Sequence, residues 1–406
     1  MTPPSIPTPP PFRRAARIAR IELSEIVQLT ERAARLRAEG QDVIALSTGE
    51  PDFPTPAHVI EAAHQAALAG QTRYPATLGT PALRDRIAAQ AGVERGNVIV
   101  STGAKQVIAN AMLASLDPGD EVVMPAPYWT SYSDIVAMAE GVPVVLDCPA
   151  GSGFRLSPEQ LAAALTPKTR WLMLNAPANP TGCLYSAAEL RALADVLVAH
   201  PQVMILMDEI YDLLAYGPVA TLREVAPELA GRMLVVNGVS KAYAMTGWRI
   251  GWGIGPAGMI AALGAVQGQV TSGACSIAQA AALAALSGPQ ELLAERREIL
   301  RARRDLVVEG LNALPGITCP SPDGAFYVFP NIEGAMARLR LESCAAFCAE
   351  LLEQEGLALV PGRAFGLPGH LRLSFAYGTA DLEAGLARLA RFVTAGMATA
   401  QDGDRA

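Results

Sequence analysis

The stretch Val203-Met204-Ile205-Leu206-Met207-Asp208 is a run of five apolar residues that ends in a carboxylate. A short, continuously apolar run is typical of a strand that is buried on both faces of a parallel sheet. Similar runs lie on both sides of it in the chain, and amphipathic Ala- and Leu-rich segments separate them. The expected strands are residues 98–101, 121–124, 143–146, 171–175, 203–208, 233–237 and 249–254. This alternation predicts an α/β fold with a mostly parallel seven-stranded sheet covered by helices.

A chain of 406 residues is long enough for about two domains. We assign residues 56–300 to the large domain that contains the sheet. The expected order of elements then changes, with a strand at 326–329, a helix at 343–355 and a strand at 370–375. This order predicts a smaller α/β domain over residues 301–398. Residues 21–55 are expected to join the smaller domain. The Pro-rich lead, residues 1–20, and the tail, residues 399–406, are expected to be disordered.

The composition narrows the possible functions. Apolar residues make up 51% of the chain, charged residues 17%, and the net charge is −7. This balance fits a compact enzyme and argues against nucleic acid as a partner. No apolar stretch reaches the length of a membrane span, and no secretory signal is recognisable. The six cysteines form no CxxC pair and the four histidines form no ligand-spaced cluster, which favours a reduced, cytoplasmic protein without a metal site.

The strongest local motif is Ser240-Lys241, which follows the expected strand 233–237 and Gly238. Sheets of this kind place their ligands at the carboxyl ends of the strands. Taken alone, Lys241 also fits an ordinary surface lysine in a loop. The functional interpretation therefore depends on the other residues that follow strands.

Several of these residues match the needs of pyridoxal phosphate. Asp208 ends its strand where an unpaired carboxylate is costly, and a protonated pyridine nitrogen is a fitting partner. Tyr211 and Asn179 can donate to the phenolate oxygen, and Trp129 can stack on the ring. Each also has a structural interpretation: a helix N-cap for Asp208, a tight turn for Asn179 and a core position for Trp129.

The phosphate group has candidate ligands as well. The strand 98–101 leads into Gly103-Ala104-Lys105 and then an Ala-rich segment, which aims backbone N–H groups and a helix N-terminus at an anion. Arg249 lies eight residues after Lys241 and can bind the same phosphate with two parallel hydrogen bonds.

Taken together, the motifs resemble those of the fold-type I pyridoxal-phosphate aminotransferases, in the subgroup that contains bacterial aspartate aminotransferases. The matching motifs, in chain order, are Ser47-Thr48-Gly49-Glu50-Pro51-Asp52-Phe53, Thr72-Arg73-Tyr74, Gly103-Ala104-Lys105-Gln106, Pro127-Tyr128-Trp129, Asn179-Pro180-Thr181-Gly182, Asp208-Glu209-Ile210-Tyr211, Ser240-Lys241, Gly247-Trp248-Arg249 and Arg372-Leu373-Ser374. They extend over most of the chain, from about residue 43 to 378.

The resemblance assigns roles to these residues. It implies that Lys241 binds the cofactor covalently as a Schiff base and that Ser240 and Ala104 contact the cofactor. It implies that Arg372 binds the substrate α-carboxylate, with Gly49, Trp129 and Asn179 also contacting the substrate. Tyr74 is expected to reach the phosphate of a neighbouring subunit, so the resemblance implies a homodimer with shared active sites.

Substrate choice depends mainly on Lys105, because a lysine at this turn contacts the distal carboxylate of dicarboxylic substrates in the similar aspartate-type enzymes. We therefore predict a ping-pong aminotransferase acting on aspartate and 2-oxoglutarate. Glutamate or aspartate with prephenate, or an aromatic amino acid, is the alternative. A lone lysine at an exposed helix N-terminus is the structural interpretation of the same residue.

Two other functions are left open. A pyridoxal-phosphate C–S lyase uses the same lysine. An NAD-dependent oxidoreductase is suggested by the GxGxxG pattern of residues 253–258. The second signal is weak, since no acidic residue follows between Gly258 and Gln290, whereas the nucleotide-binding motif requires one about 20 positions later.

Overall fold

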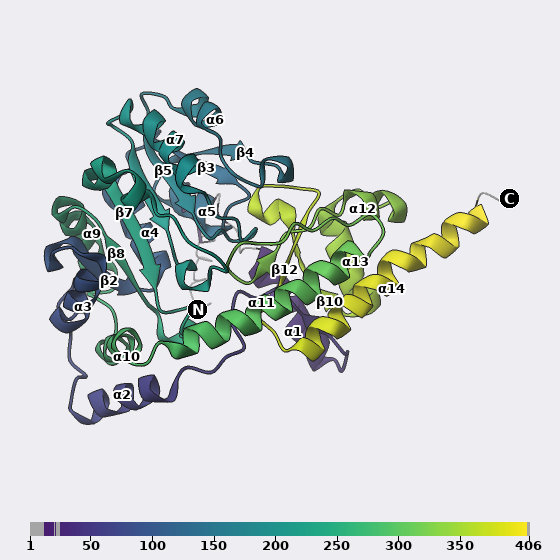
Figure 1. The fold of residues 1–406 in the computed structure, drawn as a ribbon, viewed down its shortest axis with the longest axis horizontal. Helices are drawn as coiled ribbons and strands as arrows, with labels where there is room; N and C mark the ends of the chain where they lie inside the picture. Colours follow the sequence, from purple (N-terminus) through teal and green to yellow (C-terminus); the bar gives the residue numbers. More distant parts are fainter. Residues whose placement is uncertain (1–11, 20, 22–24, 404–406) are drawn as a thin grey trace, which may run out of the picture.

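The protein is built from a large domain around one sheet and a smaller domain beside it, joined by a long helix (Figure 1). This computed structural model describes residues 12–19, 21 and 25–403. Residues 1–11, 20 and 404–406 of the predicted disordered lead (1–20) and tail (399–406) lie outside the described residues. The described part of the tail is helical, because the last helix continues to Gly403.

The large domain contains a seven-stranded sheet in the order β2-β8-β7-β6-β5-β3-β4. Its strands are β2 (Val98–Thr102), β3 (Glu121–Ala126), β4 (Val142–Asp147), β5 (Thr169–Asn175), β6 (Met204–Asp208), β7 (Met233–Gly238) and β8 (Ile250–Ile254). All neighbours pair in parallel except β8, which is antiparallel to both β2 and β7. The predicted fold class and its mostly parallel sheet are confirmed.

Helices cover both faces of this sheet, as the alternation of side chains along β7 illustrates. Leu234 and Val236 belong to the core cluster that includes residues of α4, α5 and α9. Met233 and Val235 point to the opposite face, where α6, α7 and α8 pack. The helices of this domain are α2 (Ala57–Leu68), α3 (Pro81–Ala91), α4 (Ala104–Ser115), α5 (Ser131–Met138), α6 (Pro158–Ala164), α7 (Ala187–Val198), α8 (Leu222–Val225), α9 (Ala257–Val270) and α10 (Ser276–Ser287).

Local sequence explains where several of these helices begin. Ser157, Ser186 and Thr221 each cap a helix with the side-chain oxygen, and a Gln or Glu three residues later bonds back to the capping residue. These capping boxes satisfy N–H groups that a helix start leaves free. At the other end of α3, Gly92 adopts the left-handed conformation that suits glycine.

The smaller domain gathers segments from both ends of the chain. Its strands are β1 (Ile44–Ala45), β9 (Tyr327–Val328), β10 (Leu357–Ala358), β11 (Val360–Pro361) and β12 (Leu371–Ser374), and its helices are α1 (Glu25–Ala38), α12 (Glu333–Leu339), α13 (Cys344–Glu355) and α14 (Thr379–Gly403). β1 pairs in parallel with β10, while β12 lies between β11 and β9 in an antiparallel sheet. Helix α11 (Glu291–Asn312) spans the predicted domain boundary and crosses from one domain to the other (Figure 1).

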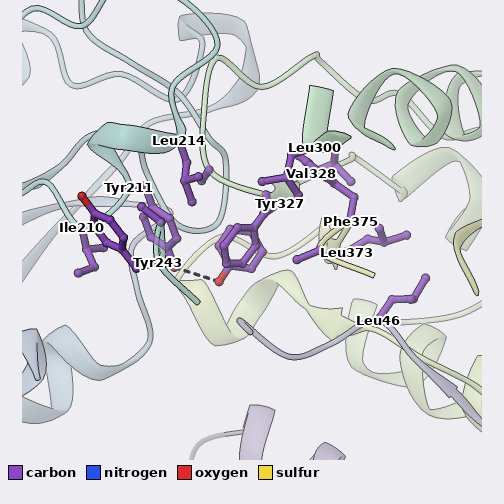
Figure 2. Packing of buried hydrophobic residues seen from close by; sticks show 14 of the residues in the cluster. Leu46, Ile210, Tyr211, Leu214, Tyr243, Leu300, Tyr327, Val328, Leu373 and Phe375 are labelled. Atoms are coloured by element: carbon purple, nitrogen blue, oxygen red, sulfur yellow. Dashed lines mark hydrogen bonds between the residues drawn. The ribbon is translucent and has the colours of Figure 1, made fainter. Parts of the chain in front are cut away.

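The hydrophobic core is continuous across the two domains. Its largest cluster includes Tyr211 of the large domain and Tyr327, Leu373 and Phe375 of the smaller one (Figure 2). The site between the domains therefore has a packed wall on one side. Among the described helices, none has the length and apolar character needed to cross a bilayer.

Candidate active site

A cavity of about 430 Å³ lies where the two domains meet. It is lined by Ile26, Gly49, Ala104, Lys105, Ile108, Trp129, Asn175, Asn179, Asp208, Ile210, Tyr211, Ser240, Lys241, Thr246, Arg249, Tyr327 and Arg372. The structure thus brings together all the site residues predicted from the sequence except Gly103 and Tyr74. Gly103 lies behind the wall, against Arg249, and Tyr74 lies elsewhere on the surface.

Lys241 follows β7 and reaches into this cavity. Its Nζ donates a 2.6 Å hydrogen bond to the backbone oxygen of Gly49. Burial, followed by the positive charges of Arg372 and Arg249, lowers the pKa of Lys241 to about 8. About a tenth of this amine is therefore neutral at pH 7, far more than for an ordinary lysine, and the neutral form is the one that attacks a carbonyl group.

Asp208 is the last residue of β6 and is buried. Its Oδ2 accepts a 2.6 Å hydrogen bond from the hydroxyl of Tyr132, and its Oδ1 accepts one from the backbone N–H of Ile210. Burial raises the pKa of Asp208 to about 6. Asp208 caps no helix, since the next helical turn starts at Asp212, so its carboxylate is free to bind a cationic group in the cavity.

Tyr211 and Tyr327 bring the two domains into contact at the cavity. Their hydroxyls are 2.9 Å apart and hydrogen-bonded, as the dashed line in Figure 2 marks. Burial raises the pKa of Tyr211 well above its usual range, so the hydroxyl keeps its proton. It can therefore donate a hydrogen bond to an anionic oxygen in the cavity.

The turn before α4 forms a narrow pocket with Arg249. Gly103 has φ +83°, and a Cβ there would lie 2.4 Å from the Nη2 atom of Arg249. Gly251 is equally constrained, because a Cβ on it would lie 2.2 Å from the backbone nitrogen of Ala104. Only glycine allows the guanidinium and the helix N-terminus to approach this closely. The result is a site for an anionic group such as a phosphate.

Arg372 approaches the cavity from β12 and is only 1% exposed. It donates hydrogen bonds to Oδ1 of Asn179 at 3.0 Å and to the backbone oxygen of Ser47 at 2.5 Å. Its guanidinium lies over the rings of Tyr327 and Phe365. Within the described residues it has no carboxylate partner, and its Nε lacks a hydrogen bond. A structural ion pair therefore does not account for Arg372.

Lys105 and Trp129 lie at the other end of the cavity. Lys105 is an exposed residue in the first turn of α4, and its Nζ lies 4.7 Å from the centre of the Trp129 ring. Desolvation and the charge of Arg249 lower the pKa of Lys105. Trp129 is partly buried rather than a core residue, so its ring is available to the cavity.

Sequence reasoning missed four polar residues of this site: Tyr132, Asn175, Thr246 and Tyr327. Asn175 could have been found, because it ends β5 as Asp208 ends β6, and the two residues are register partners. Its amide donates to the backbone oxygen of Asp208, and its side-chain oxygen accepts from the N–H of Asn179. The two tyrosines carry no such local signal.

Comparison with known proteins identifies the family. Residues 41–389 match the family model described as "Aminotransferase class I and II". The chain belongs to the class I and II aminotransferases. It is 50% identical to an aspartate aminotransferase of Rhizobium meliloti, over 93% of this chain and 95% of that protein. It is 47% identical to an aspartate/prephenate aminotransferase of Cereibacter sphaeroides, over 92% and 97% of the two chains.

Solved structures agree with this assignment. The crystal structure of the Rhizobium meliloti aspartate aminotransferase matches with a TM-score of 0.89 and 49% identity, over 94% of this chain and 99% of that one. The Thermus thermophilus aspartate aminotransferase with maleate matches with a TM-score of 0.88 and 39% identity, over 94% and 100%. The protein is a pyridoxal-phosphate-dependent transaminase, and these comparisons select that function over the lyase and the oxidoreductase.

The GxGxxG pattern has a structural explanation. Gly253 lies in β8, which is antiparallel to its neighbours, whereas a dinucleotide-binding motif needs a parallel βαβ unit. A Cβ on Gly253 would lie 2.7 Å from Val107 of α4, so this glycine serves close packing.

The chemistry of the cavity fits pyridoxal phosphate. A buried carboxylate suits the pyridine nitrogen, a protonated tyrosine suits the phenolate oxygen, and the Gly103 turn with Arg249 suits the phosphate. Lys241 has the lowered pKa that covalent attachment requires. All of these groups face one cavity, or close its wall, without any rearrangement of the backbone.

Proposed function

We propose that this protein transfers the amino group of aspartate to 2-oxoglutarate. The observation that carries the proposal is the placement of two positive groups, Arg372 and Lys105, on the same cavity. Arg372 lies on the smaller-domain side and Lys105 on the large-domain side. A dicarboxylic amino acid could bind one group with each carboxylate, whereas a monocarboxylic substrate would leave Lys105 unpaired.

In this proposal, each residue has one task. Arg372 binds the α-carboxylate with the parallel hydrogen bonds that a planar guanidinium allows, and so orients the substrate Cα. The neutral amine of Lys241 would act as the base that takes the proton from the substrate Cα. Pyridoxal phosphate, when bound, supplies an aldehyde for the amino group and a ring that delocalises negative charge.

The remaining residues hold the ring in place. Asp208 keeps a proton on the pyridine nitrogen, and Tyr132 and the Ile210 N–H orient its carboxylate. Asn179 and Tyr211 donate to the phenolate oxygen, while Trp129 stacks on the ring face. Arg249, Ser240 and the Gly103-Ala104 turn would bind the phosphate and so hold the ring in a fixed position relative to Lys241 and Arg372.

Prephenate is a second candidate acceptor, and relatives named aspartate/prephenate aminotransferase favour it. Prephenate carries a second carboxylate, so the same pair of cations would bind it. Its bulky ring would have to lie near Ile26 and Ile108, the apolar residues of the cavity wall.

We further propose a cytoplasmic homodimer with shared active sites. Tyr74 is 93% exposed and does not line the cavity of its own chain, so a large aromatic side chain is left in solvent. Contact with the phosphate of a second copy would give this side chain a role and bury it. Sedimentation of the holoenzyme and Tyr74→Phe measure the dimer and the phosphate contact separately.

A panel of amino and keto acids tests the proposed substrates. Aspartate with 2-oxoglutarate is expected to give the highest kcat/KM, with ping-pong kinetics. Alanine and leucine as donors are expected to be at least about tenfold poorer, since they lack the second carboxylate. Equal activity with alanine and aspartate would refute the dicarboxylate proposal. A higher kcat/KM with prephenate than with 2-oxoglutarate would select the second candidate.

A further inference from the structure

A second, open groove crosses the opposite side of the active-site wall. Two adjoining cavities of about 550 and 470 Å³ form it, and both are lined by Arg223, Val235 and Ile254. The groove lies on the sheet face where the cluster containing Val235 meets the cluster containing Trp252. Its volume is in the range that small-molecule sites occupy.

Residues 208–212 form a thin wall between this groove and the active site. Asp208, Ile210 and Tyr211 line the active-site cavity, whereas Glu209 and Asp212 line the groove. Glu209 faces away from Asp208 because successive residues at the end of a strand point to opposite faces of the sheet. A molecule in the groove would therefore touch the segment that positions two proposed cofactor ligands.

The groove presents an acidic group without a partner. Glu209 is mostly withdrawn from solvent, yet its side chain makes no hydrogen bond or ion pair within the described residues. Burial, followed by the charges of Asp212, Asp208 and Glu224, raises the pKa of Glu209 to about 8, and Arg223 offsets this only in part. A positive group beside Glu209 would relieve both the desolvation and the repulsion.

The same groove presents a basic group and an apolar surface. Arg223 is partly buried and makes no hydrogen bond or ion pair within the described part of the chain. Val235, Trp252 and Ile254 form the apolar floor. Asp212, in contrast, already accepts from Asn237 at 2.8 Å, which fixes its carboxylate next to Glu209.

We propose that this groove binds a free α-amino acid with an apolar side chain. Its ammonium group would lie against Glu209 and Asp212, its carboxylate against Arg223, and its side chain on the apolar floor. A simple cation would leave Arg223 unpaired and a simple anion would leave Glu209 unpaired, so the zwitterion is the ligand that matches both charges. Because the ligand would contact residues 208–212, its binding would be coupled to the active site. This proposal does not depend on which acids the enzyme transaminates.

Calorimetry with L-leucine tests the proposal. The probe is added to the holoenzyme in its pyridoxamine-phosphate form, which already carries an amino group and cannot react with another amine. A Kd on the order of 1 mM is expected. Methylammonium and acetate, which carry one charge each, are expected to bind at least about tenfold more weakly.

Variants separate the groove from the active site. Glu209→Gln and Arg223→Gln are each expected to weaken leucine binding at least about tenfold, whereas Arg170→Gln, an exposed arginine elsewhere on the same sheet, is expected to leave it unchanged. Arg372→Leu removes the proposed carboxylate site of the active site, and leucine binding is expected to survive it. Arg223 is only partly buried and makes no hydrogen bond or ion pair within the described residues, so its variant remains informative if Glu209→Gln fails to fold.

The coupling has its own measurement. Leucine is expected to shift the pH at which the absorbance of the aldehyde form of the bound cofactor changes by about 0.5 unit in Arg372→Leu, which lacks the proposed substrate carboxylate site, but not in the double variant Arg372→Leu with Arg223→Gln. The proposal is overturned if the wild-type protein gives no binding heat, or if Arg372→Leu abolishes binding. Binding that both Glu209→Gln and Arg223→Gln leave intact would also overturn it.

Discussion

The two cationic ends of the active-site cavity are built in opposite ways. Arg372 is 1% exposed, donates to Asn179 and to the Ser47 backbone, and lies over two aromatic rings. Lys105 is exposed, and its ammonium group has the Trp129 ring as its close neighbour. A rigid, desolvated arginine suits a group that every substrate shares. A less confined lysine, with few fixed partners, suits the group by which substrates differ.

Lys241 lines the same cavity, and its loss is expected to have the largest effect. Lys241→Ala removes both the proposed attachment point of the cofactor and the proposed base for the Cα proton. We expect kcat to fall by at least about 10⁴-fold for every substrate. Stopped assays over hours, with an absorbance spectrum of the purified variant, measure this. Retention of turnover and of the visible absorbance would contradict the assignment of Lys241.

Arg372→Lys tests the rigid end. A lysine keeps the charge but loses the planar fork and the stacking on Tyr327 and Phe365. We expect kcat/KM to fall about 10²-fold, equivalent to about 3 kcal/mol, for all amino donors alike. Steady-state kinetics with aspartate and alanine check the uniformity. A loss restricted to aspartate would assign Arg372 to the distal carboxylate instead.

Lys105→Ala tests the flexible end and is expected to have a smaller, selective effect. Aspartate should lose about tenfold in kcat/KM, mainly through KM, because one partly screened ion pair is removed. Alanine should be unaffected, since it has no carboxylate for Lys105. Lys168→Ala, at an exposed lysine outside the cavity, serves as the matched control. An unchanged KM for aspartate would disprove the specificity role.

The pH dependence of covalent cofactor attachment tests whether the pKa of Lys241 is lowered by its neighbouring arginines. Arg372 and Arg249 help to lower the pKa of Lys241 to about 8, and only the neutral amine reacts. The rate at which apoenzyme binds pyridoxal phosphate covalently should therefore rise about tenfold from pH 7 to pH 9 and level off above pH 8. Arg372→Leu should move this profile to higher pH. A flat profile would contradict a titrating Lys241.

Asp208→Asn is expected to change the melting temperature of the apoenzyme, and this is the smallest of the predicted effects. Burial raises the pKa of Asp208 in the folded protein to about 6, above its value in the unfolded chain. The contribution of Asp208 to the free energy of unfolding is therefore fully present below the pKa of the unfolded chain and is lost as the pH rises through about 6. Above that pH the apoenzyme holds a buried charge at a cost. The variant apoenzyme should melt a few degrees higher at pH 8, with less difference at pH 5, while cofactor affinity falls. Differential scanning calorimetry measures both forms, and an equal Tm at pH 8 would argue against this cost.

The sequence alone predicted the strands and most of the cavity because both depend on local patterns. Apolar runs such as 203–207 determine strands, and polar residues after them, such as Asp208 and Asn179, are gathered by parallel strands at one edge. Lys241 was ambiguous by itself and became interpretable only through these companions. The predicted strands of the smaller domain, 326–329 and 370–375, are longer than β9 and β12 in the structure, because the bounds of short strands depend on their pairing partners.

Only the tertiary structure revealed Tyr132 and Tyr327 as parts of the site. Their hydrogen bonds to Asp208 and Tyr211 join residues 76 and 116 positions apart, a separation that no local pattern encodes. The antiparallel direction of β8 and the pairing of β1 with β10 also depend on contacts between distant segments, so no local pattern predicts them. The sequence determined which groups are present and which strands deliver them. Packing in the folded protein decided which of these groups are buried and which hydrogen-bond partners they have, and burial in turn shifts their pKa values. The same packing makes Arg372 a rigid, buried group and leaves Lys105 exposed.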